Sequence, residues 1–231
     1  MRVLLTAFEP YGEWTTNSSW LTLIEVLRRR PPSTQLVTRR YPVDFPQVEQ
    51  LLAKDLAQEF DAIVHLGQAP GTPTIRLEAM AINAGEAINT SRAVNSGGTV
   101  NSGGTINKGG LNLPRLVPDG PEAYRSRMPL ERWRGRLHEQ AIPATISYHA
   151  GTYLCNAVMY LSQHWLATAG LLTPVGFIHL PLSTEQVVAS AKELPSLPTA
   201  TLADAVVGIL DDLEQMDVEL GGAWSQGNEV A

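Results

Sequence analysis

The sequence contains a single cysteine, Cys155, in 231 residues. One thiol excludes a framework of internal disulfide bonds and is typical of a protein kept in a reducing compartment. A lone cysteine is either an inert, small apolar side chain of the core or a reactive group, depending on its surroundings. The position of Cys155 in the sequence therefore has to decide between these two roles.

Long apolar runs and long runs of like charge are also absent. No stretch of about 18 or more apolar residues occurs, and the apolar run before Phe8 is too short for a secretory signal, so we expect a soluble, cytoplasmic protein. The 17 basic and 23 acidic residues give a formal net charge of −6 and are well dispersed. This distribution excludes the electrostatic footprint of a nucleic-acid-binding or membrane-binding protein and favours a small or neutral partner.

The residues that are present indicate one α/β domain over residues 1–231. A hydrophobic share of 44% is enough to bury a substantial core. Apolar runs typical of strands occur at residues 2–7, 36–41, 62–67, 75–83, 144–148 and 175–180, and segments with helical periodicity occur at 20–27, 48–56, 155–165 and 199–220. This alternation predicts a mostly parallel sheet covered by helices on both faces, with functional groups at the carboxyl ends of the strands.

A Gly/Asn/Ser-rich segment at about residues 89–112 interrupts the alternation. The unit at residues 95–100 recurs at 101–106 and in part at 107–110. Three degenerate copies are too few for a capped β-helix, and they contain little apolar surface to offset the entropy of ordering. We therefore expect a mobile loop or arm there, and a flexible tail at residues 221–231.

Cys155 follows a small-residue turn and is predicted to lie in the first turn of a helix, where the helix dipole favours a thiolate. His179 is predicted at the end of a strand on the same sheet edge, a position that suits a general base. Of the other histidines, His65 lies within an apolar strand and is interpreted as a core residue. His138 and His164 are expected on helix surfaces, and His149 in a turn.

Glu78 lies in an otherwise apolar strand, where a buried carboxylate is costly unless a hydrogen-bonded or charged partner compensates it. An imidazole is one suitable partner. Two other interpretations stay open from the sequence alone: an edge strand on which Glu78 faces solvent, and an ion pair between Glu78 and Arg76.

Five blocks of the sequence resemble the pyroglutamyl peptidase I (pyrrolidone carboxylate peptidase) family, in the family's order. They are Thr6–Gly12, Gly67–Gly71, Glu78–Asn83, Gly151–Asn156 and Gly176–Pro181. The resemblance covers nearly the whole chain, and the blocks that contain Cys155 and His179 are the most specific.

This resemblance implies a cysteine hydrolase that removes N-terminal pyroglutamate from peptides through a thioester. Cys155 falls on the family's nucleophile, His179 on its base and Glu78 on its orienting acid. The residues expected to bind the substrate are Phe8 and Tyr11, which enclose the lactam ring, together with Gln68, Tyr153 and Leu154, while Asn17 is expected to support the site.

The resemblance also implies a three-layer α/β/α fold with a central twisted sheet, similar to phosphorylases and hydrolases. It further implies a homodimer or homotetramer, and neither a metal nor an organic cofactor.

The sequence departs from the family at two arginines. The arginine that usually follows the family's glutamate is Ala79 here, and a second arginine position falls on Ile88, for which Arg92 substitutes only if the chain shifts. These departures keep open a catalytically impaired relative that binds pyroglutamyl-like termini without efficient turnover. Two further alternatives are a transferase on a phosphorylase-like scaffold and an interaction protein built on the repeats. No Gly-rich phosphate loop in the sequence supports the transferase.

Overall fold

The computed structural model describes residues 1–30, 35–85 and 113–219. Within these ranges the strands are β1 (Arg2–Phe8), β2 (Gln35–Tyr41), β3 (Ala62–Gln68), β4 (Ile75–Glu78), β5 (Met80–Ile82), β6 (Ala123–Arg125), β7 (Ala144–Ser147), β8 (Val175–Leu180), β9 (Leu182–Ser183) and β10 (Ser196–Leu197). The helices are α1 (Ser18–Arg29), α2 (Phe45–Leu56), α4 (Leu130–Glu139), α5 (Leu154–Thr168), α6 (Thr184–Ser190) and α7 (Thr199–Glu219).

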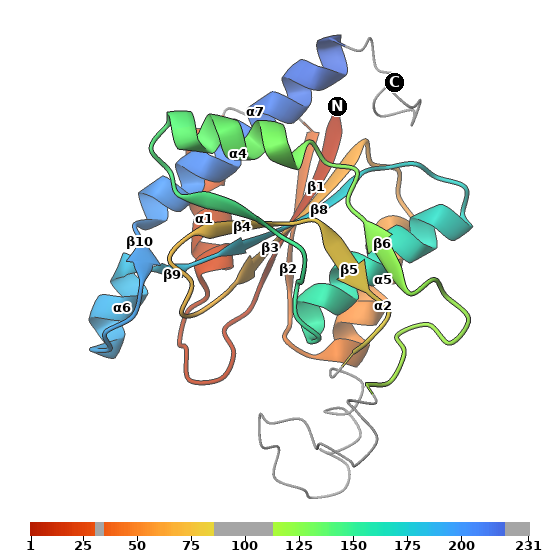
Figure 1. The fold of residues 1–231 in the computed structure, drawn as a ribbon, viewed down its shortest axis with the longest axis horizontal. Coiled ribbons are helices and arrows are strands. Elements are labelled where there is room, and N and C mark those ends of the chain that lie inside the picture. Colours follow the sequence, from red (N-terminus) through yellow and green to blue (C-terminus); the bar gives the residue numbers. More distant parts are fainter. Residues whose placement is uncertain (31–34, 86–112, 220–231) are drawn as a thin grey trace, which may run out of the picture.

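The central sheet has six strands in the order β2-β1-β3-β8-β4-β7. The first four strands of this order run parallel, β4 runs antiparallel to β8, and β7 runs parallel to β4. The expected α/β fold with a twisted, mostly parallel sheet is confirmed (Figure 1). Because β4 runs antiparallel to β8, the first residues of β4, and not its last, lie at the end of the sheet where β1, β3 and β8 have their carboxyl ends.

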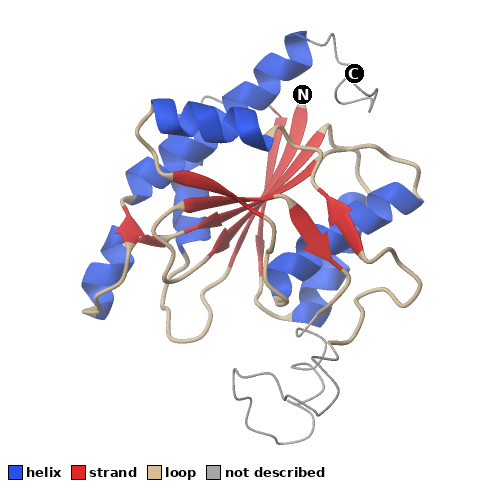
Figure 2. Ribbon diagram, in the orientation of Figure 1, coloured by secondary structure: helices blue, strands red, loops and turns tan. Residues whose placement is uncertain are grey.

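Helices cover both faces of this sheet (Figure 2). On one face α1 and α4 pack against α7, and on the other α2 packs against α5. Each layer has its own buried core: Leu5, Val64 and Ile178 belong to the first, and Phe8 and Phe177 to the second. Alternating residues of one strand thus serve opposite layers, as the period of two along a strand requires.

The prediction of a single strand at residues 75–83 was wrong, because the chain divides at Ala79 into two strands that belong to different sheets. β4 lies in the central sheet, whereas β5 pairs with β6 in a separate two-stranded ribbon. The Ala79 N–H donates to Ser147 O at 2.7 Å, and the Ala79 carbonyl accepts from Ser126 N at 2.8 Å. Ala79 therefore bonds to β7 on one side and to the residue that follows β6 on the other, a geometry that hydrophobic periodicity does not reveal.

The helices at 20–27 and 48–56 are confirmed, but the side chains that gave their periodicity are not all buried. In α1, Leu23 is buried and Leu27 is 44% exposed; in α2, Leu52 is buried and Leu51 is 39% exposed. Helix α4 was not predicted, although its apolar residues Leu130, Trp133 and Leu137 have helical spacing.

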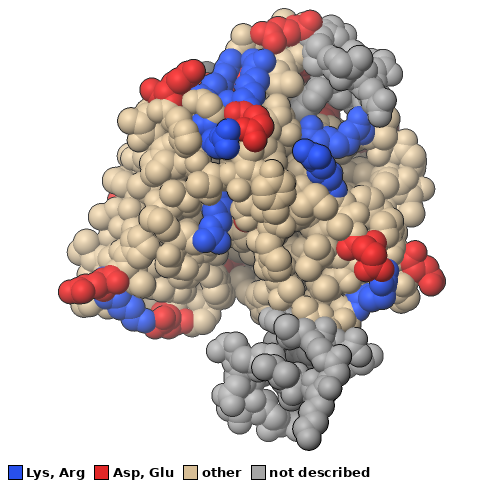
Figure 3. All heavy atoms as spheres, viewed as in Figure 1, with Lys and Arg blue, Asp and Glu red and all other residues tan. Residues whose placement is uncertain are grey.

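The repeat segment, with Ile88 and Arg92, and the expected tail at residues 221–231 lie outside the described residues. No helix in the described ranges is both long enough and apolar enough to cross a membrane. On the face shown in Figure 3, basic and acidic side chains lie in small groups, several of them mixed, separated by uncharged surface.

Candidate active site

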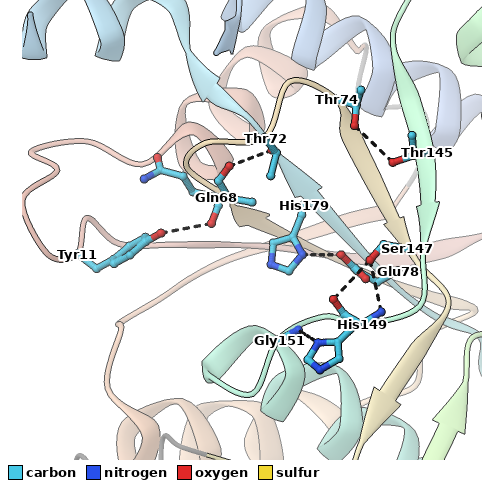
Figure 4. A network of polar contacts seen from close by, with 11 residues as sticks. Tyr11, Gln68, Thr72, Thr74, Glu78, Thr145, Ser147, His149, Gly151 and His179 are labelled. Carbon is cyan, nitrogen blue, oxygen red and sulfur yellow. Dashed lines mark hydrogen bonds and ion pairs between the residues drawn. The ribbon is translucent and has the colours of Figure 1, made fainter. Parts of the chain in front are cut away.

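The candidate site lies where the parallel strands end beside the first turn of α5. Phe8 ends β1, Gln68 ends β3, and His179 is the last residue but one of β8. Cys155 is the second residue of α5, as the sequence predicted. Glu78, the last residue of the reversed strand β4, lies opposite Phe177 and so is set back from this end of the sheet, but Figure 4 shows Glu78 and His179 pointing toward each other.

The local sequence gives the Cys155 sulfur room at this edge. Gly151 has a φ of +82°, which a side chain would make unfavourable, and it lets the chain turn into α5. Gly67 lies against the site: a Cβ there would be 2.7 Å from the Phe177 ring and 3.2 Å from Cys155 Sγ. A glycine is therefore needed at position 67 for the sulfur to lie beside β3 and β8.

Asn156 holds the start of α5 in place. Its side chain is fully buried, accepts from Ile82 N at 2.9 Å, and donates to the carbonyls of Ile82 at 2.9 Å and Ala84 at 2.8 Å. All three bonds join the residue after Cys155 to the β5 segment. No role was predicted for Asn156, although an amide beside the only cysteine, at the start of an apolar helix, was an available signal.

Glu78 and His179 form a buried pair. Glu78 Oε1 lies 2.8 Å from His179 Nδ1, and the two residues are 0% and 8% exposed. Both alternatives for Glu78 are wrong: β4 lies between β8 and β7, and no ion pair joins Glu78 to Arg76 within the described residues. The acceptor at Nδ1 orients the ring so that Nε2 is available to the sulfur.

The charges around His179 reverse the effect of its burial. Burial by itself lowers the pKa of the imidazole, but the Cys155 charge, a side-chain hydrogen bond with Cys155, and the hydrogen bond and charge of Glu78 together raise the pKa of His179 to about 9. The site therefore favours the protonated, imidazolium form of His179.

A cavity of about 420 Å³ opens beside these residues. Its lining combines aromatic and apolar side chains with a few polar groups, in the residues Phe8, Tyr11, Asn17, Val43, Gln68, Ala69, Arg76, His149, Ala150, Gly151, Tyr153, Leu154, Cys155 and His179. A concave, largely apolar wall with a few convergent polar groups is typical of a small-molecule site.

Phe8 and Tyr11 form the aromatic part of the wall. Phe8 is 3% exposed, and its ring centroid lies 6.4 Å from that of Phe177. The Tyr11 hydroxyl donates to the Gln68 carbonyl at 3.3 Å (Figure 4). Burial, and then the charge of Cys155, raise the pKa of Tyr11 to about 12, so the phenol stays neutral.

In the Gln68 side-chain amide, hydrogen bonds hold the oxygen but not the nitrogen. Its Oε1 accepts from Ser18 N at 2.7 Å and from Gln186 Nε2 at 2.8 Å, and Gln186 Nε2 also donates to Thr16 O. The Gln68 amide nitrogen is buried and has no hydrogen-bond partner in the described part of the chain. Gln186 was missed by the sequence analysis, and nothing in its local sequence points to the site.

The other expected residues also lie at the cavity. Asn17 caps α1 by accepting from Ser19 N at 3.0 Å, and it ties the preceding loop by donating to Glu9 O at 2.9 Å. Leu154 is buried, and Tyr153 is 39% exposed.

The remaining histidines divide between core and surface. His65 is fully buried as expected, between Thr6 Oγ1 at 2.7 Å and Ser162 Oγ at 3.0 Å. His149 lies in a turn as expected, but it also lines the cavity and accepts from Gly151 N at 2.9 Å (Figure 4). Within the described ranges, no group of three or more His, Cys, Asp or Glu side chains is placed to hold a metal ion.

Comparisons with known proteins identify the family of the chain. The family model for pyroglutamyl peptidase matches residues 1–213. The pyrrolidone-carboxylate peptidase of Pyrococcus furiosus is 36% identical over 189 residues, covering 81% of this chain and 84% of that protein. That of Thermococcus onnurineus is 34% identical over 209 residues, covering 89% and 94%.

Solved structures show the same fold. A mutant pyrrolidone carboxyl peptidase from P. furiosus superposes with a TM-score of 0.77 at 32% identity, covering 94% of this chain and all of that one. The Fervidobacterium islandicum enzyme gives a TM-score of 0.76 at 32% identity, covering 93% and 99%. The chain therefore belongs to the pyroglutamyl peptidase family of cysteine peptidases.

Proposed function

We propose that this protein removes N-terminal pyroglutamate from peptides by forming a thioester on Cys155. The observation that carries the proposal is the buried contact of 2.8 Å between Glu78 and His179, next to the sulfur at the start of α5. A nucleophile, a base and a group that orients the base are the parts that acyl transfer needs.

In the proposed reaction, His179 takes the Cys155 proton before the substrate reacts, and the thiolate sulfur then attacks the pyroglutamyl carbonyl carbon. The imidazolium gives its proton to the peptide nitrogen as the carbon–nitrogen bond breaks, which leaves pyroglutamate bound to Cys155 as a thioester. A water molecule, deprotonated by His179, then attacks the thioester, and the thiol and pyroglutamate are released. Glu78 holds the ring and stabilises the imidazolium.

The start of α5 provides donors for the oxyanion that forms on the carbonyl. The first backbone N–H groups of an α-helix have no partner within the helix, and Tyr153 makes no side-chain cap bond. The N–H of Cys155 is one of these donors. One such donor contributes about 3–4 kcal/mol to acyl-transfer catalysis.

The cavity suits a neutral lactam ring. Phe8 and Tyr11 supply the flat, apolar surface that a five-membered ring requires, and the lining residues that the structure describes include no carboxylate that would select a free ammonium group. The unpartnered Gln68 amide nitrogen supports a role as donor to the lactam carbonyl. Tyr153 and Leu154 border the approach to Cys155 in this proposal, and Asn17 positions the loop that carries Tyr11.

The test is hydrolysis of a pyroglutamyl coumarin amide by the wild-type protein and by Cys155→Ala. We expect turnover by wild type, its loss on treatment with iodoacetamide, and loss of about six orders of magnitude in Cys155→Ala, as for nucleophile removal in other acyl-transfer enzymes. Mass spectrometry of acid-quenched reactions is expected to find pyroglutamate on the Cys155 peptide.

Two results would contradict the proposal. Turnover that persists in Cys155→Ala would remove the thiol from the mechanism. Binding of pyroglutamyl peptides without release of pyroglutamate would instead favour the catalytically impaired relative.

A further inference from the structure

Arg76 places a permanent positive charge in the wall of the cavity. It lies on β4 directly opposite His179 on β8, in an antiparallel pair. Side chains of directly opposed residues point to the same face, with Cβ atoms about 4.5–5.5 Å apart. Because Arg76 and Glu78 are two residues apart on one strand, they share that face as well.

The guanidinium has no counterion there in the described part of the chain. Most arginines of the described chain form ion pairs with Asp or Glu, but the Arg76 side chain forms neither an ion pair nor a hydrogen bond with any described residue. Among the described residues, the cavity lining contains no Asp or Glu. In a chain with a net charge of −6, an unpaired guanidinium in a cavity is a site for an anionic group from outside the chain.

The position of Arg76 indicates which part of a substrate it meets. In the proposed function, on which this inference rests, His179 gives its proton to the departing amine, so the departing residue lies beside His179. In the sheet, β1 and β4 lie on opposite sides of β8. Phe8 ends β1 and Tyr11 follows it, so the aromatic wall that the lactam ring would contact lies on the β1 side. Arg76, on β4, is therefore on the leaving-group side of the scissile bond.

We propose that Arg76 binds a carboxylate of the residue that follows pyroglutamate, and so makes the enzyme prefer substrates that carry one. Two sources supply this carboxylate: the α-carboxylate of a pyroglutamyl dipeptide and the side chain of an acidic residue in that position. The planar guanidinium matches a carboxylate through two parallel N–H donors.

The experiment compares two matched pairs of substrates. The first pair is pyroglutamyl-alanine and its C-terminal amide, and the second is pyroglutamyl-glutamate amide and pyroglutamyl-glutamine amide. For each, kcat and KM are measured with the wild type, Arg76→Gln and Arg76→Lys. Arg125→Gln is the control, because Arg125 is an exposed arginine on β6 that does not line the cavity.

We expect the wild type to favour the carboxylate member of at least one pair by about ten-fold or more in kcat/KM, mainly through KM, since bonds between charged groups contribute more than neutral ones. The pair that shows the preference identifies the source of the carboxylate. Arg76→Gln is expected to abolish the preference, Arg76→Lys to retain part of it, and Arg125→Gln to retain all of it.

Wild-type protein that hydrolyses both members of each pair equally would overturn this inference alone, and that comparison needs no variant to fold. Equal losses on charged and neutral substrates in Arg76→Gln would also overturn it, because Arg76 would then act through His179. Hydrolysis of none of the four substrates would overturn the proposed function as well.

Discussion

Two buried imidazoles lie on neighbouring strands of the sheet, His65 on β3 and His179 on β8, and their environments differ in charge. His65 is fully buried between two neutral hydroxyl groups, and burial lowers its pKa to about 3. His179 is nearly as buried, but Cys155 and Glu78 raise its pKa to about 9.

The comparison shows that burial alone does not decide whether a histidine of this protein is protonated. Neutral partners leave the desolvation cost of the charged form uncompensated, so His65 stays neutral and holds β1, β3 and α5 together. Charged partners more than offset the same cost at His179. One position is thus suited to stability, and the other to proton transfer.

The largest expected effect is the difference in activity between a variant of His179 and a variant of His65. His179→Gln should lower kcat/KM for a pyroglutamyl amide by about four to six orders of magnitude. His65→Leu should retain most activity but lower the unfolding free energy by about 2–4 kcal/mol, because two buried hydroxyls lose their partner. Hydrolysis rates and urea unfolding of both variants are the measurements, and similar activity losses in the two would contradict the distinction.

The next effect concerns Glu78. Glu78→Gln keeps a hydrogen-bonding group beside His179 but removes the negative charge, so the pKa of His179 should fall below about 9. The alkaline limb of the kcat/KM profile should move to lower pH, and kcat should fall by about 10⁴-fold, as when the orienting acid of a related triad is neutralised. An unchanged alkaline limb would show that Glu78 does not set the charge of His179.

The smallest effect concerns stability against pH. His65 has a lowered pKa in the folded state, so its contribution is present above about pH 6.5 and is lost as the pH falls toward 3. Between pH 7 and pH 5 we expect a loss of about 2 kcal/mol of unfolding free energy from this residue. His65→Leu should lack this component in urea unfolding, and an identical acid dependence in both proteins would contradict it.

His179 contributes in the opposite pH direction. Its folded-state pKa is raised, so its contribution is present below about pH 6.5 and is lost as the pH rises toward 9. Comparison of wild type with His179→Gln in urea at pH 7 and pH 9 isolates it. A wild type that loses no more stability than the variant over this range would argue against the raised pKa.

Much of the site was predictable because its residues end strands or begin a helix. Apolar runs placed Phe8, Gln68 and His179 at one sheet edge, and the turn before Cys155 placed the sulfur at a helix start. The family resemblance then grouped Cys155 and His179 with Glu78. A core role for His65 followed from its position inside an apolar strand.

The direction of β4 was not predictable, because periodicity gives the faces of a strand and not its orientation or its neighbours. That reversal makes Arg76, and not the end of the strand, the residue at the cavity edge. The bonds of Asn156 to Ile82 and Ala84 depend on the same unforeseen division at Ala79. The oligomeric state, the cytoplasmic location and the role of the repeat segment stay predictions.

The most direct test of the account is an NMR titration of both imidazoles in the wild-type protein. The account predicts that His179 loses its proton near pH 9, and that His65 stays neutral as far down in pH as the fold survives. Titration of His179 at or below 6.5, the ordinary histidine value, would contradict the imidazolium held between Cys155 and Glu78, and with it the proposed chemistry of the site.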